Sequence, residues 1–173
     1  DGFVVFVDKF TKYVVIEPVC STLTSHQFAS IFQRSIIRRF GLPEEIISDR
    51  DCRFTSEFWR DTCAALGIRR HMSSSFHPQT DGQSERANSV VLQHIRSILK
   101  ELDLQPESWV DILWLVEIAI NNSPSASTSF SPFYLLYGFD PVFPHEVPIE
   151  KKLVMESAGE FVKRMSNFLS VAE

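Results

Sequence analysis

Long apolar runs are absent from this sequence. It has no stretch of about 18 uninterrupted apolar residues, the length that a membrane-spanning helix needs. The first twenty residues also lack the basic segment and apolar run of a secretory signal. The sequence therefore predicts neither a membrane span nor a signal peptide. Because the chain opens inside the apolar run of residues 3–7, we expect position 1 to be a cut in a longer protein.

Paired cysteines and clustered histidines are absent as well. The three cysteines, Cys20, Cys52 and Cys63, are an odd number without a C-x-x-C pair. None of the five histidines lies three to five residues from another. These spacings argue against a disulfide framework and against a structural zinc site, and they favour a reducing compartment.

An overall excess of basic residues, the usual sign of a nucleic-acid partner, is also lacking, because the formal net charge is −5. The charge is unevenly spread along the chain. Residues 1–100 hold 13 Lys and Arg against 11 Asp and Glu, a balance of +2, whereas residues 101–173 hold 4 against 11, a balance of −7. A nucleic-acid face is therefore expected in the first part, where bound divalent cations would mask some acidic groups.

What is present is enough apolar sequence for one globular domain, with 44% hydrophobic residues in a chain of 173. The pattern predicts a β-hairpin, then alternating helices and strands, and finally helices alone, which is typical of an α/β domain with a mixed sheet. The expected elements are mostly buried hairpin strands at residues 3–7 and 13–16, a helix at 24–40, a strand at 45–48, a helix capped by Thr55 or Ser56, a strand at 68–72, a loop at 73–82, helices at 84–102, 107–121 and 132–137, and an amphipathic helix at 156–172.

Two surface features of this pattern allow more than one interpretation. The wide apolar stripe from Trp109 to Ile120 predicts core, with a subunit interface as the alternative. Arg69 and Arg70 are expected to be exposed charge.

Two carboxylates stand where rigid elements meet loops. Asp49 follows the short strand at 45–48, and Glu85 is expected in the first turn of the long helix, with 35 residues between them. Carboxylates held in this way suit hard divalent ions such as Mg²⁺. Taken alone, Asp49 could equally open a turn and Glu85 could be a favourable charge near a helix N-terminus.

The sequence around these two residues resembles a known family. Two segments closely resemble integrases of gypsy-class long-terminal-repeat retrotransposons. The first is residues 48–56, with Ser48-Asp49-Arg50 and Arg53-Phe54-Thr55-Ser56. The second is residues 76–88, which run from Phe76-His77-Pro78 to Glu85-Arg86-Ala87-Asn88. Similar pieces occur at residues 6–12, 121–123 and 131–138. The resemblance covers about residues 1–141 in the family's order.

The resemblance implies an RNase H-like fold, a mixed sheet flanked by helices, with a D,D-35-E site. It further implies two Mg²⁺ or Mn²⁺ ions in the complete site, held in part by Asp49 and Glu85. Metal-dependent phosphoryl transfer on DNA would then process 3′ ends and join them to target DNA. DNA as partner, a homodimer or higher oligomer, and a nuclear location follow from the same resemblance.

One departure concerns the first carboxylate, which in related integrases lies on a strand before the hairpin. We expect this residue upstream of position 1, and we assign neither Asp1 nor Asp8 to the metals. The chain should then lack the N-terminal strand of its sheet and should be inactive alone.

The remaining expectations concern the residues that contact DNA, the domain boundaries within the chain and an alternative function. His77 and Gln79 lie in a loop that resembles the one closing over DNA ends, and Arg86 is a candidate phosphate contact; an ordinary polar turn and a solvated helix face are the alternatives. We expect the catalytic core at residues 1–148 and a linker with a C-terminal helix at 149–173. The rival function is a domesticated or inactive core that only binds nucleic acid or protein.

Overall fold

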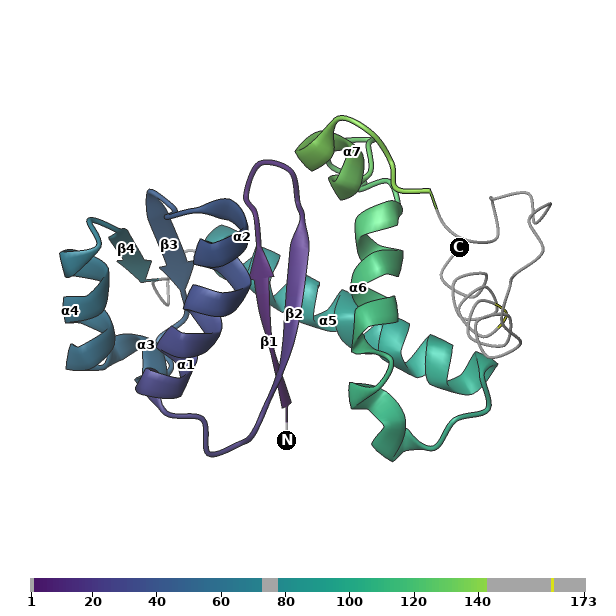
Figure 1. Cartoon of the computed structure of the whole chain (residues 1–173), viewed down its shortest axis with the longest axis horizontal. Coiled ribbons are helices and arrows are strands. Elements are labelled where there is room, and N and C mark those ends of the chain that lie inside the picture. The colour runs from purple at the N-terminus through teal and green to yellow at the C-terminus, as the bar shows by residue number, and fades with distance from the viewer. Residues whose placement is uncertain (1, 73–77, 143–162, 164–173) are drawn as a thin grey trace, which may run out of the picture. The chain divides into compact units, whose positions relative to one another are not determined.

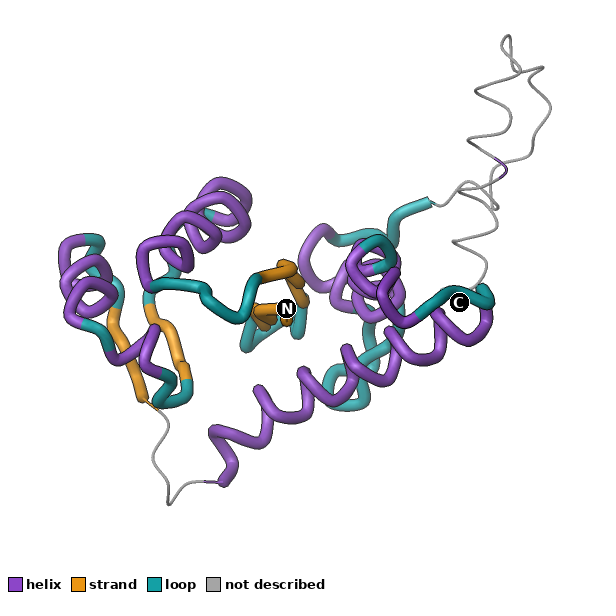
Figure 2. Tube along the Cα trace, turned by 90° about the horizontal axis from the view of Figure 1, so that it is seen from below, coloured by secondary structure: helices purple, strands orange, loops and turns teal. Residues whose placement is uncertain are grey.

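A computed structural model describes residues 2–72, 78–142 and 163 (Figure 1), without the side chains of residues 78–85. The strands in this part are β1 (Gly2–Val7), β2 (Val14–Val19), β3 (Glu45–Ser48) and β4 (Arg69–Met72). The helices are α1 (Ser25–Phe32), the π-helical turn η1 (Gln33–Ile37), α2 (Arg38–Phe40), α3 (Cys52–Thr55), α4 (Glu57–Ala65), α5 (Pro78–Glu101), the 3₁₀ turn η2 (Pro106–Val110), α6 (Leu113–Asn122) and α7 (Pro132–Tyr137). The trace in Figure 2 follows these helices and strands through the same residues.

The chain forms two compact units. Unit 1 contains the described residues among 1–5 and 17–87, and unit 2 contains those among 6–16 and 88–173. Among the described residues, the strands make a β1–β2 hairpin and a parallel β3–β4 pair. The predicted α/β class is confirmed, with both hairpin and parallel pairing present.

Unit 1 is organised around a cluster of aromatic side chains. Trp59 of α4 is 1% exposed and meets Phe28 and Phe32 of α1 edge to face, with ring centroids 4.8 and 5.4 Å apart. Cys63, one turn after Trp59, is fully buried. This packing fixes α1 and α4 against each other beside the parallel pair.

The predicted helix at residues 24–40 forms as one helical segment with a π turn inside it. Thr24 caps it, its side chain accepting the Gln27 N–H while the Gln27 side chain accepts the Thr24 N–H. Gly41, at φ 84°, ends it. Within the π turn, Arg34 Nη2 donates to Glu17 Oε2 at 2.9 Å.

Unit 2 closes one edge of β2 with side chains of α6. The buried Asn121 accepts the Val14 N–H through Oδ1 and donates Nδ2 to the Val14 carbonyl, both at 2.8 Å. One turn earlier, Glu117 Oε2 accepts the Ile16 N–H at 2.8 Å. A helical turn of about 5.4 Å nearly matches the two-residue rise of a strand, so α6 supplies the hydrogen bonds of a neighbouring strand.

Three predicted helix features differ from the structure. The long helix begins at Pro78 rather than at residue 84, because proline suits a first helical turn and Gly82 in a helix costs only about 1 kcal/mol. Glu85 therefore lies well inside α5, not in its first turn. The helix expected at 107–121 is split, because η2 is a 3₁₀ turn and Ile112 (φ −101°, ψ −1°) interrupts the backbone before α6.

The burial predicted for three features can be compared with the structure, and two of the three differ. β1 is half-buried rather than mostly buried, because in the described sheet it pairs on one side only, with β2. Arg70 is half-buried, not exposed, since its Nη2 donates to the Phe54 carbonyl at 2.7 Å. The Trp109 to Ile120 stripe is mainly core, because Leu115 and Val116 are fully buried.

No helix in the described ranges has the length and apolar character to span a membrane. The predicted amphipathic helix at 156–172 and the boundary at 148/149 lie outside the described residues.

Candidate active site

Asp49 follows the last residue of β3 and is exposed. Its Oδ1 accepts the backbone N–H of Asp51 at 3.1 Å, which holds the carboxylate in a tight turn. The strand therefore delivers a carboxylate to the start of the connection from β3 to α3, in a fixed local conformation and open to solvent.

Asp51, two residues later, has a different environment. It caps α3, with Oδ1 accepting the Arg53 N–H at 2.9 Å. The Arg53 guanidinium donates two hydrogen bonds to the same carboxylate, from Nε to Oδ1 and from Nη2 to Oδ2, each at 2.7 Å. These hydrogen bonds from Arg53 lower the pKa of Asp51 from 3.8 to about 2.

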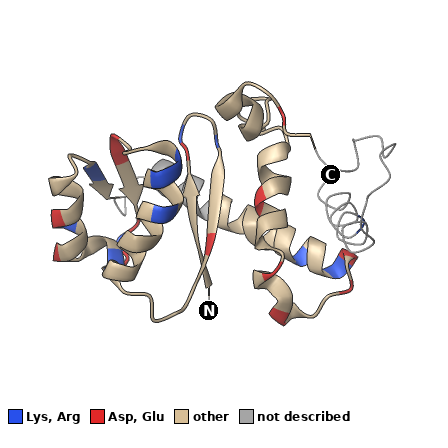
Figure 3. Ribbon diagram, viewed as in Figure 1, with Lys and Arg blue, Asp and Glu red and all other residues tan. Residues whose placement is uncertain are grey.

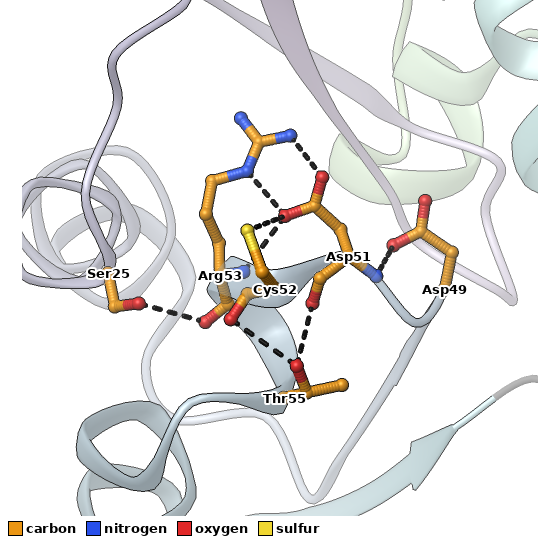
Figure 4. A network of polar contacts seen from close by, with 6 residues as sticks. All are labelled: Ser25, Asp49, Asp51, Cys52, Arg53 and Thr55. Atoms are coloured by element: carbon orange, nitrogen blue, oxygen red, sulfur yellow. Dashed lines mark hydrogen bonds and ion pairs between the residues drawn. The ribbon is translucent and has the colours of Figure 1, made fainter.

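The turn that carries both aspartates is tied to its surroundings (Figure 4). The Arg53 carbonyl accepts hydroxyl groups from Ser25 of α1 at 3.2 Å and from Ser56 at 3.0 Å. Thr55 Oγ1 donates to the Asp51 carbonyl at 3.3 Å. Because these bonds link α1, α3 and the start of α4, the position of Asp49 is fixed by packed elements.

The two carboxylates therefore differ in what they can bind. Both oxygens of Asp51 accept hydrogen bonds from the Arg53 guanidinium. A cation that bound Asp51 would have to displace this bidentate, charge-assisted pair of hydrogen bonds. Asp49 is exposed, and among the described residues its Oδ1 accepts a single backbone N–H, so its oxygens fit the oxygen-ligand chemistry of Mg²⁺ or Mn²⁺. Within the described side chains, no group of three or more His, Cys, Asp or Glu is placed to hold a metal ion.

The other predicted site residues fall partly outside the description. His77 and the side chains of Gln79 and Glu85 lie outside the described residues. Asp49 and Glu85 belong to the same compact unit. Arg86 is described and is exposed on α5.

Asp8 has a structural task that accounts for its position after β1. Its Oδ2 accepts both the Thr11 N–H at 2.7 Å and the Thr11 hydroxyl at 2.6 Å, closing the hairpin turn. This engagement gives Asp8 a structural role in the hairpin turn.

Sequence reasoning missed the pairing of Asp51 with Arg53. The signal was present, because an Asp two residues before an Arg at a helix start allows capping and an ion pair together. The pairing gives the two aspartates of the Asp49-Arg50-Asp51 run different environments.

The chain is similar in sequence to known integrase core domains and retrotransposon polyproteins. The Integrase core domain family matches residues 3–78, a span that contains Asp49 and stops before Glu85. The chain is 33% identical over 160 residues to the Transposon Tf2-3 polyprotein of Schizosaccharomyces pombe, covering 92% of this chain and 12% of that protein. The chain thus spans about an eighth of the length of this relative.

Solved structures share the fold at lower identity. The chain in the simian T-cell lymphotropic virus intasome in complex with PP2A regulatory subunit B56 gamma has a TM-score of 0.64 at 20% identity, over 88% of this chain and 52% of that one. The HTLV-2 integrase catalytic core domain in complex with magnesium, in its dimeric form, has a TM-score of 0.58 at 18% identity, over 78% and 83%. These likenesses confirm the predicted RNase H-like fold of integrase cores.

Proposed function

We propose that this chain is the catalytic core of a retrotransposon integrase, on the basis of the Integrase core domain match over residues 3–78 and of the retrotransposon polyproteins that it resembles. Its reaction is metal-dependent phosphoryl transfer on DNA, in which 3′ ends are hydrolysed and then joined to target DNA. The observation that carries the proposal is the exposed carboxylate of Asp49, fixed at the end of β3 while Asp51 is locked to Arg53.

We assign the metal ligands of this chain to Asp49 and Glu85. Asp49 contributes oxygen ligands from a rigid turn, and Glu85 contributes a second carboxylate from α5, with 35 residues between the two. Bound Mg²⁺ or Mn²⁺ would activate the attacking oxygen and stabilise the leaving one. The chain's own part is to hold these carboxylates in place and, through His77, Gln79 and Arg86, to position DNA.

A third carboxylate completes the proposed D,D-35-E site. Asp8 is engaged by Thr11 in the hairpin turn, so we propose that the first aspartate comes from sequence outside this chain. Two carboxylates would supply Mg²⁺ with one negative charge fewer than the three carboxylates of the complete site, so these 173 residues alone should be inactive. The same proposal includes DNA as partner and a nuclear location.

The test uses an integrase that contains this sequence together with its upstream strand, assayed on a DNA end with Mg²⁺ or Mn²⁺. Glu85→Gln keeps the shape of the side chain and removes its charge, so both 3′ hydrolysis and strand transfer should fall at least about a thousandfold. DNA binding should be retained. Glu57→Gln is the matched control, because Glu57 is an exposed glutamate on α4 and should leave the rate unchanged.

Full activity in the Glu85→Gln variant would refute the metal assignment. DNA binding without any cleavage by the unmodified integrase would favour the alternative of a domesticated binding module. Strong activity of the 173-residue chain by itself would show that the first carboxylate lies within it, and Asp8 would be the residue to substitute next.

A further inference from the structure

The turn of the β1–β2 hairpin presents an exposed aromatic ring between two lysines. Phe10 is 81% exposed, more than any other large apolar side chain in the described part of the chain. Lys9, which is exposed, precedes it, and Lys12, which is half-buried, follows two residues later. Figure 3 shows basic residues on both arms of this turn. We call residues 9–12 the hairpin tip.

Hydrogen bonds hold the hairpin tip in one conformation. The Lys12 backbone N–H donates to the Asp8 carbonyl at 2.9 Å, and the buried Thr11 is bound to the Asp8 carboxylate. Lys12 has a left-handed backbone (φ 65°), and its Nζ donates to the Lys9 carbonyl at 2.7 Å. Because the turn is already ordered, a ligand of Phe10 would bind with a lower entropic cost.

The hairpin tip is also anchored in unit 2. Tyr13, the next residue along the chain, is buried and packs edge to face against Phe133 at 5.6 Å and Tyr137 at 6.1 Å. Val14 is bound through its backbone to Asn121. The exposure of Phe10 therefore belongs to a hairpin whose following strand is firmly packed.

The charge of the hairpin tip is opposite to that of the whole chain. Residues 8–12 hold two Lys against one Asp, a balance of +1, in a chain of net charge −5. An ammonium group has three donors, so Lys12 keeps two after its bond to the Lys9 carbonyl. A ring between two cations fits a ligand that alternates flat rings with anionic groups. A single strand of nucleic acid has this chemistry.

We propose that the hairpin tip binds an unpaired stretch of a DNA strand, with Phe10 stacked on a base and the two lysines on the neighbouring phosphates. Bases inside a duplex are already stacked on their neighbours, and an unpaired base offers its face to an aromatic ring. The proposal rests on the proposed function for DNA as the partner. It adds the form of that DNA and a contact outside the Asp49 turn.

The test of the ring is fluorescence anisotropy of the 173-residue chain with a labelled oligothymidine strand, in EDTA so that binding is measured without metal. Phe10→Leu keeps an apolar side chain and removes the flat ring, so it should raise the dissociation constant at least about fivefold. The affinity for a blunt duplex should not change. Phe139→Leu is the matched control, because Phe139 is 63% exposed in unit 2, and it should leave both affinities unchanged.

The lysines are tested by the salt dependence of the same binding. Lys9→Gln with Lys12→Asn removes both charges, and asparagine tolerates the left-handed backbone of position 12. The slope of log affinity against log salt should become shallower by about 1.4, because each phosphate contact on a single strand contributes about 0.7. Circular dichroism of every variant checks that the fold is intact.

Three results would overturn the proposal: equal losses in Phe10→Leu and Phe139→Leu, equal losses on single-stranded and duplex DNA, or an unchanged salt slope in the lysine variant. Absence of binding by the unmodified chain would overturn it as well. None of these results depends on metal, so they are distinguishable from a failure of the proposed function, which the Glu85→Gln rates decide.

Discussion

At the scale of single residues, the main finding is that two aspartates in one short turn have different environments. Asp49 is exposed, and Asp51 is locked by Arg53 and caps α3. The sequence predicted Asp49 correctly as the residue after a strand. The ion pair of Asp51 with Arg53 was missed, because the spacing of an Asp two residues before an Arg allows this pairing but does not show which rotamers the folded turn selects.

The pKa of Asp51 gives a prediction about stability. Its value falls from 3.8 to about 2 on folding, so the stabilisation is complete above the unfolded value and is lost as pH falls through the folded one. Asp51→Asn should lower the free energy of unfolding by about 1–2 kcal/mol at pH 7. Urea unfolding should show this difference shrinking between pH 4 and pH 2. A difference of the same size at pH 7 and pH 2 would contradict the assigned cause.

At the scale of secondary structure, α6 acts as a substitute strand along one edge of β2. Asn121 and Glu117 satisfy the backbone groups of Val14 and Ile16, which point to the same edge because they are two residues apart. This arrangement covers an edge that would otherwise offer unpaired backbone to another chain.

Replacing the buried amide of Asn121 tests this arrangement. Asn121→Leu keeps a similar volume but leaves the Val14 N–H and carbonyl without partners, which should cost about 2–4 kcal/mol of unfolding free energy. Chemical denaturation measures the loss. Asn122→Leu, at the half-buried neighbouring position, is the control and should cost much less. Equal losses in the two variants would show that the hydrogen bonds to β2 are not the cause.

Helix boundaries were predicted correctly where apolar periodicity and capping residues agreed. They were missed where a residue that is common in loops is also compatible with a helix, or where the apolar spacing fits two kinds of helix. Thr24 and Gly41 correctly bounded the helical segment after the hairpin, and Ser56 caps α4 as expected. The start of α5 was missed because Pro78 and Gly82 are commonest in loops yet are both compatible with a helix here. The break before α6 was missed because apolar spacing does not separate a 3₁₀ turn from an α-helix.

At the scale of the whole molecule, the resemblance to integrases correctly anticipated the fold and the match to the Integrase core domain, and composition alone would not have done so. A net charge of −5 argues against a DNA partner, whereas the motif around Asp49 argues for one. The assignment of Glu85, His77 and Gln79 and the boundary at residue 148 stay predictions.

The most direct test of the central claim is the rate of strand transfer by an integrase containing this chain, compared between Asp49→Asn and Asp51→Asn. Both substitutions remove one negative charge from the same turn, so they match in size and in local charge. Asp49→Asn should abolish the reaction, by at least about a thousandfold, with DNA binding retained. Asp51→Asn, corrected for its folded fraction, should keep at least about a tenth of the rate, because Asp51 only holds α3. The reverse order of the two rates would contradict the claim that Asp49 is the metal-binding carboxylate.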